Sequence, residues 1–347
     1  MKLIRTFHPV GHGAFYTERF YDENGKNIAN VVYDCGSKTI SYQDLDAVIN
    51  SEFRQGENIN FVFISHFHDD HVSGILSLCR RCHVQSIVVP LLPNDYKLWT
   101  MLYNAITYGV NSRGNELLNN DFEIGDLEGT DITFVEHQHD IPLTPNNQPL
   151  LQWRYHAYRL PNYSKTFSRR YATLINALRN NPAFAPAFNA GQNIDFDVLY
   201  NILTHPQNIT TLKILINQNN IRLNGNNFNM VVSSQRSIPF AHNNSFQGCL
   251  YTGDAELKAI RRMNSLQYQV TLNKQNYDII QVPHHGAFSN NHNITLYDNL
   301  QLCIISAQKN DRHHPHLTTV NDIISKNCLP KIVSEDNRSH VKLTYTI

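Results

Sequence analysis

The chain has 347 residues, 41% hydrophobic and 17% charged, which is the composition of one large or two modest globular domains. Its 29 lysines and arginines balance its 29 aspartates and glutamates, so no global basic field attracts nucleic acid and no acidic tail is present. The N-terminal residues lack the apolar core of a signal peptide, and no apolar run reaches the ~20 residues of a membrane span. We therefore expect a cytoplasmic protein with no membrane partner and with reduced cysteines.

Strand-like and helix-like segments alternate in the first third of the chain, which predicts a layered α/β fold. Residues 30–33 (NVVY) are expected to form a strand that ends at Asp34. Residues 60–65 (NFVFIS) form a second predicted strand, which is apolar on both faces and therefore central in a sheet. A helix is expected over residues 72–78 and a third strand over residues 85–90.

A pair of cysteines, Cys79 and Cys82, ends the predicted helix and is followed by His83. This CxxCH spacing also serves covalent haem attachment, which requires export, and a structural zinc site would need a second pair. We interpret the two residues as helix-end thiols without a cofactor.

The amino-acid composition and the hydrophobic pattern of the chain change between residues 161 and 227. Before it, residues 131–136 and 151–160 alternate like strands with one solvated face, while residues 112–119 carry no clear pattern. Within it, pieces rich in Asn, Pro and Ala separate helix-like segments at residues 164–179, 196–203 and 211–216. We interpret residues 161–227 as a helical insertion, either a lid over an active edge or a solvated cap. Strands are expected to return at residues 229–233, 247–252, 277–282, 302–306, 331–334 and 341–347.

The richest stretch follows the second predicted strand and reads HFHDDH. Residues i and i+2 of a strand point the same way, so His66 and His68 project together from its carboxyl end. After a turn, Asp70 and His71 face a point close by, whereas Asp69 points away and orients a ligand. Imidazole and carboxylate are ligands of borderline divalent ions such as zinc, so the stretch predicts two metal positions rather than a solvated turn.

This HxHxDH pattern resembles the second motif of the metallo-β-lactamase-fold hydrolases, and further motifs follow in family order. Asp34 in VVYDCGS matches the aspartate that supports the ligand loop, Asp254 in CLYTGDAE matches the metal-bridging aspartate, and His284 in PHHGA matches the last histidine ligand. The resemblance implies a four-layer αββα sandwich over residues 1–347, with the insertion at 161–227 inside it. It also implies two divalent ions, zinc or alternatively manganese, held by His66, His68, Asp70, His71, Asp254 and His284.

Within that superfamily the chain is most similar to the hydrolase domain of bacterial DNA-uptake channel proteins and its stand-alone relatives, which act on phosphodiesters. The shared features are a VGxG turn at residues 10–13, an Asn-Asn pair at 226–227, TGD, PHHG, and a late N…HPH with Asn310 and residues 314–316. That group usually carries an aspartate after VGxG, where this chain has Ala14.

The third-motif histidine of the superfamily, a ligand of the first metal, has no clear counterpart. His137 and His139 end a predicted strand, and His156 is a further candidate, although a surface position is the ordinary explanation for each. If none of them coordinates, the first site holds its ion more loosely than the second.

Two divalent ions ~3.5–4 Å apart would hold a water between them and lower its pKa towards ~7. Asp70 would accept or orient its proton, and the resemblance places His285 and His314 beside the metals, to protonate a leaving group or bind a phosphate oxygen. No GxSxG or other nucleophile motif is present. The iron-dependent oxygen-reducing branch of the fold carries glutamate where this chain has His68, which favours hydrolysis.

These features predict a metal-dependent phosphodiesterase or nuclease. Nearby cations, Lys309 and Arg312, and Arg169 and Arg170 in the insertion, add weak support for a nucleic-acid substrate. The alternatives are an ester, thioester or lactone hydrolase on the same centre, and a non-catalytic metal-binding subunit that joins a protein partner in a bacterial defence system. The complete ligand set disfavours the last alternative.

Overall fold

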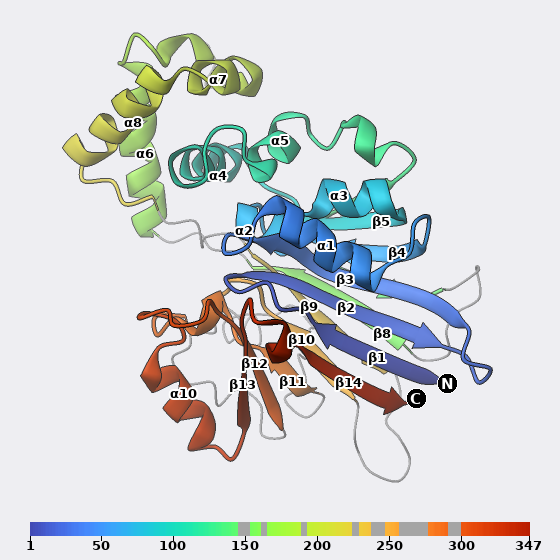
Figure 1. The fold of residues 1–347 in the computed structure, drawn as a ribbon. Helices are drawn as coiled ribbons and strands as arrows, with labels where there is room; N and C mark the ends of the chain where they lie inside the picture. The colour runs from blue at the N-terminus through green and yellow to red at the C-terminus, as the bar shows by residue number, and fades with distance from the viewer. Residues whose placement is uncertain are drawn as a thin grey trace.

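The computed structural model describes eight segments of the chain: residues 1–144, 153–160, 165–188, 193–223, 229–236, 247–256, 277–290 and 300–347. Within these segments the strands form two seven-stranded sheets that lie face to face, with helices on their outer faces (Figure 1). This arrangement confirms the predicted four-layer αββα sandwich.

The first sheet contains the strand that leads into HxHxDH. In spatial order it consists of β14 (Val341–Thr346), β1 (Lys2–Phe7), β2 (Gly13–Tyr21), β3 (Asn27–Ser37), β4 (Asn58–Phe63), β5 (His83–Pro90) and β6 (Asp131–Val135). Strand β4 pairs in parallel with β3 and β5, which confirms that it is central. The last predicted strand, β14, pairs with β1, so the chain ends lie side by side (Figure 1).

The second sheet carries the later motifs. In spatial order it consists of β13 (Leu329–Val333), β12 (Leu302–Ser306), β11 (Tyr277–Gln281), β10 (Gly248–Tyr251), β9 (Met230–Arg236), β8 (Trp153–Arg159) and β7 (Gln138–Pro142). An apolar core of side chains from both sheets fills the space between them, including Phe7, Tyr16, Tyr155 and Tyr251.

Helices α1 (Tyr42–Glu52), α3 (Ile75–Arg81), α4 (Asn94–Thr107) and α5 (Arg113–Asn119) lie on the first sheet's side of the sandwich, and α10 (Leu317–Ile324) packs on the second sheet. The helix expected over residues 72–78 is divided into α2 (Asp69–Val72) and α3. The division occurs because the Gly74 N–H donates to the Cys35 carbonyl of β3 at 2.7 Å instead of continuing the helix.

The alternation pattern does not reveal β1 or β2, because both strands place charged residues in the core. Arg5 of β1 and Glu18 of β2 are 0% and 2% exposed. Their side chains pair at 2.5 Å from Arg5 Nε to Glu18 Oε1. A pattern that assigns charge to solvent therefore misses these strands.

The insertion contains α6 (Lys165–Arg179), α7 (Phe196–Leu203) and α8 (Pro206–Gln218), as expected from its sequence. These helices share an apolar core with one face of α4, and Phe196 and Tyr200 of α7 also pack against the core under the first sheet's helices. Phe167 stacks on Tyr96 of α4 with ring centroids 4.1 Å apart. The insertion therefore forms a lobe that is attached to the sandwich through α4 (Figure 1).

All six cysteines are free thiols. Burial raises the pKa of Cys79 and of Cys82 to about 12, so both thiols stay protonated at neutral pH. None of the helices in the described segments is long and apolar enough to span a bilayer.

Candidate metal centre

The HxHxDH loop is held by Asp34, at the end of β3. Its carboxylate accepts hydrogen bonds from the Ser65 N–H and hydroxyl, both at 2.7 Å, and from His71 Nδ1 at 2.7 Å. Because Nδ1–H of His71 donates to Asp34, its Nε2 carries the lone pair that faces the site. Asp34 thus fixes the ligand loop as the first motif implies.

The first ligand cluster consists of His66, His68 and Asp70, whose donor atoms lie within 4.8 Å of one another. His66 Nε2 and His68 Nδ1 are 3.0 Å apart, so both rings converge on one point from the end of β4. All three side chains are buried. Because β4 ends at Phe63, the loop and the turn of helix after it, rather than the strand itself, bring the three side chains together.

The second ligand cluster consists of Asp70, His71 and His285. His285 Nε2 lies 3.3 Å from Asp70 Oδ2, and His285 Nδ1 donates to the Ser306 carbonyl at 2.8 Å. That hydrogen bond directs the His285 Nε2 lone pair into the site.

Asp254 lies between the two clusters. Its Oδ1 is 3.4 Å from His71 Nε2, and its Oδ2 is 3.8 Å from His66 Nε2. The Asp254 N–H donates to Asn229 Oδ1 at 3.0 Å, which fixes the loop after β10. Gly253, at φ 54°, allows this loop to approach the ligand loop, because a Cβ there would lie 2.6 Å from Ser65 Cβ.

The two histidines of PHHG, His284 and His285, lie at different depths in the structure. His285, and not His284, joins the group with Asp70 and His71. His284 lies at the rim, with its side chain 27% exposed and its Nδ1 3.4 Å from Asp254 Oδ2. Consecutive left-handed φ angles of 50° and 52° turn the second ring inward while the first stays at the surface.

The donor set fits divalent cations. His71 Nε2 and Asp254 Oδ1 are buried and have no hydrogen-bond partner among the described residues. The two atoms face each other at 3.4 Å, which is longer than an ordinary hydrogen bond, and a cation bound to both would satisfy them. The residues of the two clusters and Asp254 would hold the ions.

Burial and mutual charge keep four of these donors, His66, His68, Asp70 and Asp254, in their ligating forms. Burial would lower the pKa of His71, but Asp34 and its other carboxylate neighbours outweigh burial and raise that pKa well above its ordinary value, so a bound cation would displace its proton. Burial lowers the pKa of His66 well below its ordinary value and that of His68 to about 4. Burial opposes ionisation of Asp70 and Asp254, but their histidine neighbours outweigh it and lower both pKa values. At neutral pH the site therefore offers carboxylates and neutral imidazoles from these four residues.

Two tyrosines from the end of α4 form one wall of the candidate metal centre. The Tyr108 hydroxyl donates to Asp70 Oδ1 at 2.9 Å, and the Tyr103 ring stacks on His68 at 4.6 Å. Nothing in the local sequence marks them, because the packing of α4 alone brings them to the centre. Asp69 points away as expected and accepts from the Tyr42 hydroxyl at 3.1 Å.

None of the three candidates for the third-motif ligand joins a metal cluster among the described residues. The His137 side chain is 59% exposed. His139 lies exposed on β7, and His156 Nδ1 is 3.4 Å from Asp140 Oδ1. The other histidine expected near the metals, His314, lies beside the centre, with its ring stacked on His284 at 5.9 Å. The Asn-Asn pair at 226–227 lies outside the described residues.

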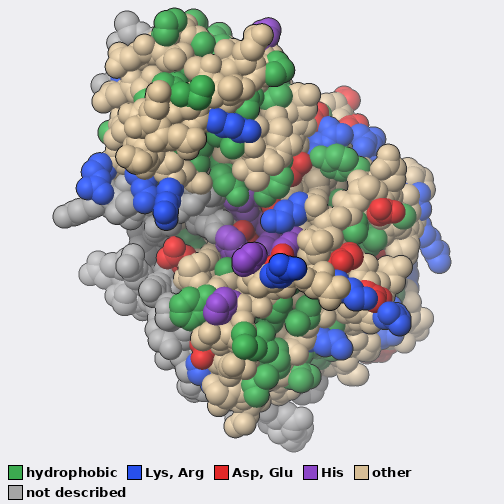
Figure 2. Space-filling model, turned by 60° about the vertical axis from the view of Figure 1, so that its left-hand side comes forward, with side chains coloured by type: hydrophobic (Ala, Val, Ile, Leu, Met, Phe, Trp, Pro, Cys, Tyr) green, Lys and Arg blue, Asp and Glu red, His purple; other side chains and the backbone are tan. Residues whose placement is uncertain are grey.

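The surroundings of the centre are rich in histidine and cations. Figure 2 shows histidine side chains gathered in a hollow on one face, with lysine or arginine side chains beside it. Lys309 pairs with Asp336 at 3.2 Å, whereas Arg312 and Arg169 are exposed. Burial and the charge of neighbours that include Lys38 lower the pKa of His284, and lower that of His314 to about 4.

Comparison with known proteins finds one family model that matches part of the chain. The family model described as "Metallo-beta-lactamase superfamily" matches residues 27–144, which include the HxHxDH loop. No curated protein matched the chain. The specific similarity to DNA-uptake channel domains stays a prediction.

Solved structures with a similar fold are distant in sequence. Unliganded yeast PDE1 is 9% identical, with 99% of each chain covered and a TM-score of 0.41. A long-form RNase Z from yeast is 12% identical, with 98% of this chain and 41% of that chain covered and a TM-score of 0.41. The subclass B3 metallo-beta-lactamase MEM-A1 from a soil metagenome library is 11% identical, with 80% and 78% covered and a TM-score of 0.35. At these TM-scores the likeness carries no argument about substrate. The superfamily match and the ligand clusters indicate a metal-dependent hydrolase with the metallo-β-lactamase fold.

Proposed function

We propose that this metal-dependent hydrolase cleaves phosphodiesters, in nucleic acid or in smaller molecules. The observation that carries the proposal is the combination of two adjoining ligand clusters with a rim of further imidazoles and a lysine. His284 and His314 are each 27% exposed beside the clusters, and Lys38 is exposed next to them. A phosphodiester is anionic, and this rim offers it cationic and N–H groups.

The proposed ligands are His66 and His68 for one ion, His71 and His285 for the other, with Asp70 and Asp254 between them. When bound, the ions supply an ionised water at neutral pH and offset the negative charge that develops on the phosphoryl oxygen. Zinc suits this imidazole and carboxylate set, and manganese is the alternative.

The protein's own groups orient the reaction. The hydroxyl of Tyr108 holds one oxygen of Asp70, so the other oxygen keeps its position beside His285. Asp70 would accept or orient the proton of the attacking water, as in general base catalysis. His284 and His314 would donate N–H groups to phosphate oxygens from the rim.

We also propose that the helical insertion limits the size of the substrate. It packs on α4, and the same helix ends in the tyrosines that contact His68 and Asp70. Figure 1 shows the insertion beside α4, and a lobe in that place would restrict the approach of a long polynucleotide to the centre.

The test is zinc- or manganese-dependent release of nitrophenol from bis(nitrophenyl) phosphate by purified protein. We expect activity that EDTA abolishes and that His68→Ala lowers by at least ~100-fold, as loss of a metal ligand does. His137→Ala, an exposed histidine outside the clusters, is the matched control and should keep full activity. Turnover of thioesters or lactones without phosphodiesterase activity would identify the other hydrolase class. Metal binding without any hydrolysis, together with a co-purifying protein, would identify the regulatory alternative.

A further inference from the structure

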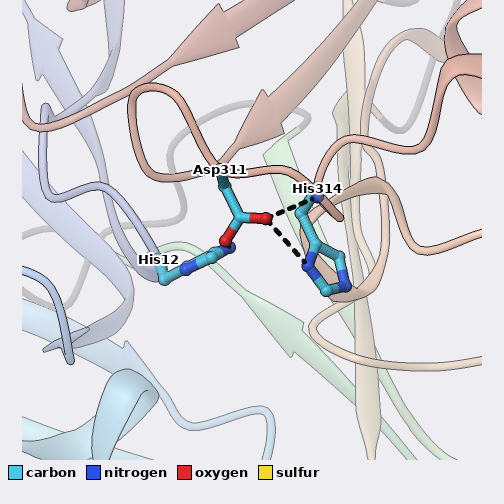
Figure 3. A group of neighbouring side chains, drawn as sticks. All are labelled: His12, Asp311 and His314. Atoms are coloured by element: carbon cyan, nitrogen blue, oxygen red, sulfur yellow. Dashed lines mark hydrogen bonds and ion pairs between the residues drawn. The ribbon is translucent and has the colours of Figure 1, made fainter.

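A third group of metal-capable side chains lies beside the two ligand clusters and shares no residue with them. It consists of His12, Asp311 and His314, whose donor atoms lie within 4.8 Å of one another. Figure 3 shows the Asp311 carboxylate between the two imidazole rings. His12 comes from the VGHG turn between β1 and β2, and the other two come from the loop after β12.

The separations in this group suit ligands around a shared ion better than hydrogen bonds. His12 Nε2 is 3.4 Å from Asp311 Oδ2, and His314 Nδ1 is 3.8 Å from Asp311 Oδ1. Hydrogen bonds between nitrogen and oxygen are about 2.7–3.2 Å long. Metal–ligand bonds of ~2.0–2.2 Å in a tetrahedral site separate the ligand atoms by ~3.3–3.6 Å, which the separation between His12 and Asp311 matches.

An unpartnered nitrogen points into the group. The His12 side chain is only 5% exposed, and its Nε2 has no hydrogen-bond partner among the described residues. A buried imidazole nitrogen left unpaired costs about 1–3 kcal/mol. A bound cation would satisfy this atom.

The backbone holds the three side chains in place. The His12 N–H donates to Thr39 Oγ1 at 2.9 Å, and its carbonyl accepts from the Lys38 N–H at 2.9 Å. Gly13, at φ 152°, lets the turn press against the ligand loop, because a Cβ there would lie 2.8 Å from the Asp70 carbonyl oxygen.

Backbone hydrogen bonds also orient the Asp311 carboxylate. Asp311 Oδ1 accepts from the backbone N–H groups of His313 at 2.6 Å and His314 at 2.9 Å, which leaves Oδ2 directed at His12. The Asp311 carboxylate also determines which charge a ligand of this group must carry. It would repel a phosphate oxygen and attract a cation.

We propose that His12, Asp311 and His314 form a third divalent-cation site, which takes zinc or manganese. Two imidazoles and one carboxylate leave coordination positions open for water or for an oxygen of the substrate. The His12 ring contacts His285 edge-on, with centroids 4.7 Å apart, so this ion would lie next to the candidate dinuclear centre. The site does not depend on the proposed phosphodiesterase activity.

The experiment is equilibrium dialysis of the full chain against zinc alone, followed by metal analysis. We expect Asp311→Asn and His314→Gln each to retain about one equivalent less than the wild type. His313→Gln, an exposed neighbour in the same loop, is the matched control and should retain the wild-type amount. The double variant His68→Ala/His71→Ala should lose metal from the other clusters and keep this equivalent.

A second measurement tests the site without counting metal equivalents. Crystals grown with zinc should show an anomalous scattering peak between the His12, Asp311 and His314 side chains. Wild-type stoichiometry in both Asp311→Asn and His314→Gln, or crystals with zinc bound only at the other clusters, would overturn the proposal. The nitrophenol assay reports separately on the proposed function, so failure of one inference is distinguishable from failure of the other.

Discussion

His71 Nδ1 donates to Asp34 Oδ2 at 2.7 Å, and both side chains are buried, at 1% and 0% exposure. Such a carboxylate fixes the ring orientation and raises the basicity of the metal-facing nitrogen. We predict that Asp34→Asn weakens zinc binding by about 10–100-fold, measured by competition with a chromophoric chelator. Asp126→Asn is the control, because Asp126 pairs with Arg80 away from the clusters and should leave zinc affinity unchanged. Equal zinc affinity in Asp34→Asn and the wild type would contradict this role.

The hydrogen bond from Tyr108 to Asp70 gives a second prediction. Tyr108→Phe removes the hydroxyl and keeps the ring, so Asp70 loses a fixed orientation. A hydrogen bond to a charged group contributes about 1.5–3 kcal/mol, so we expect turnover of the nitrophenyl phosphodiester to fall about 10–100-fold. Tyr42→Phe removes a comparable hydroxyl from Asp69 and should leave turnover at the wild-type value. An unchanged rate in Tyr108→Phe would show that Asp70 is held without this contact.

The buried pair of Arg5 and Glu18 predicts a large effect on stability. Besides Arg5, the Glu18 carboxylate accepts from the hydroxyls of Tyr155 at 2.5 Å, Ser234 at 2.7 Å and Tyr251 at 2.9 Å, all from the second sheet. Glu18→Gln leaves a buried guanidinium without its counter-charge, which costs about 3–5 kcal/mol of unfolding free energy. Urea unfolding measures the loss.

Two further variants serve as comparisons for the stability of Glu18→Gln. Arg5→Met/Glu18→Leu removes both charges and should recover much of the lost stability, since buried pairs replaced by apolar residues are often neutral. Asp126→Asn breaks the exposed pair with Arg80 and should change stability by at most ~1 kcal/mol. Similar losses in Glu18→Gln and Asp126→Asn would refute the role of the buried pair.

His8 predicts a dependence of stability on pH. Burial, with nearby positive groups, lowers the pKa of His8 from 6.5 to about 3. Between those values the unfolded chain binds a proton that the folded chain does not, so stability falls as the pH falls. The loss from this residue approaches ~1.4 kcal/mol per pH unit.

The measurement is urea unfolding in EDTA between about pH 6 and pH 4. His8→Gln keeps a donor for Thr17, whose Oγ1 lies 3.1 Å from His8 Nε2, and should show a shallower slope than the wild type. His83→Gln removes an exposed histidine and should keep the wild-type slope. Parallel slopes in His8→Gln and the wild type would show that His8 does not contribute.

The contact between the insertion and α4 predicts a change in substrate selectivity. Phe167 stacks on Tyr96 and meets the Trp99 ring at 5.1 Å, so Phe167→Ala should cost about 3–5 kcal/mol in the core of the lobe. We expect the rate on long single-stranded polynucleotides to rise relative to the rate on the small nitrophenyl substrate. Ile214→Ala, at a position 49% exposed on α8, is the control. A constant ratio of the two rates would contradict the proposal that the insertion limits the size of the substrate.

Much of the fold was predictable because local patterns and burial agree. The apolar run before His66 marks β4 as central, and the structure places it between β3 and β5. His66 and His68 converge as predicted, although β4 ends at Phe63 and both residues lie in the loop that follows it. A buried charge such as Arg5 in β1 interrupts the alternation of apolar and polar residues, and for that reason the strand is not predicted from the local sequence.

The sequence by itself therefore determined a layered α/β class and the nature of the HxHxDH loop, because those depend on periodicity and on residues close in the chain. The four-layer αββα arrangement came from the family resemblance. Only the tertiary structure decided that His285 faces Asp70, 215 positions away, and that His284 stays at the rim. It also decided that His12 meets Asp311 and His314, and that Tyr108 reaches Asp70. The physical reason is that these contacts form only when the two sheets close on each other, and side-chain directions there are set by packing and by local backbone turns.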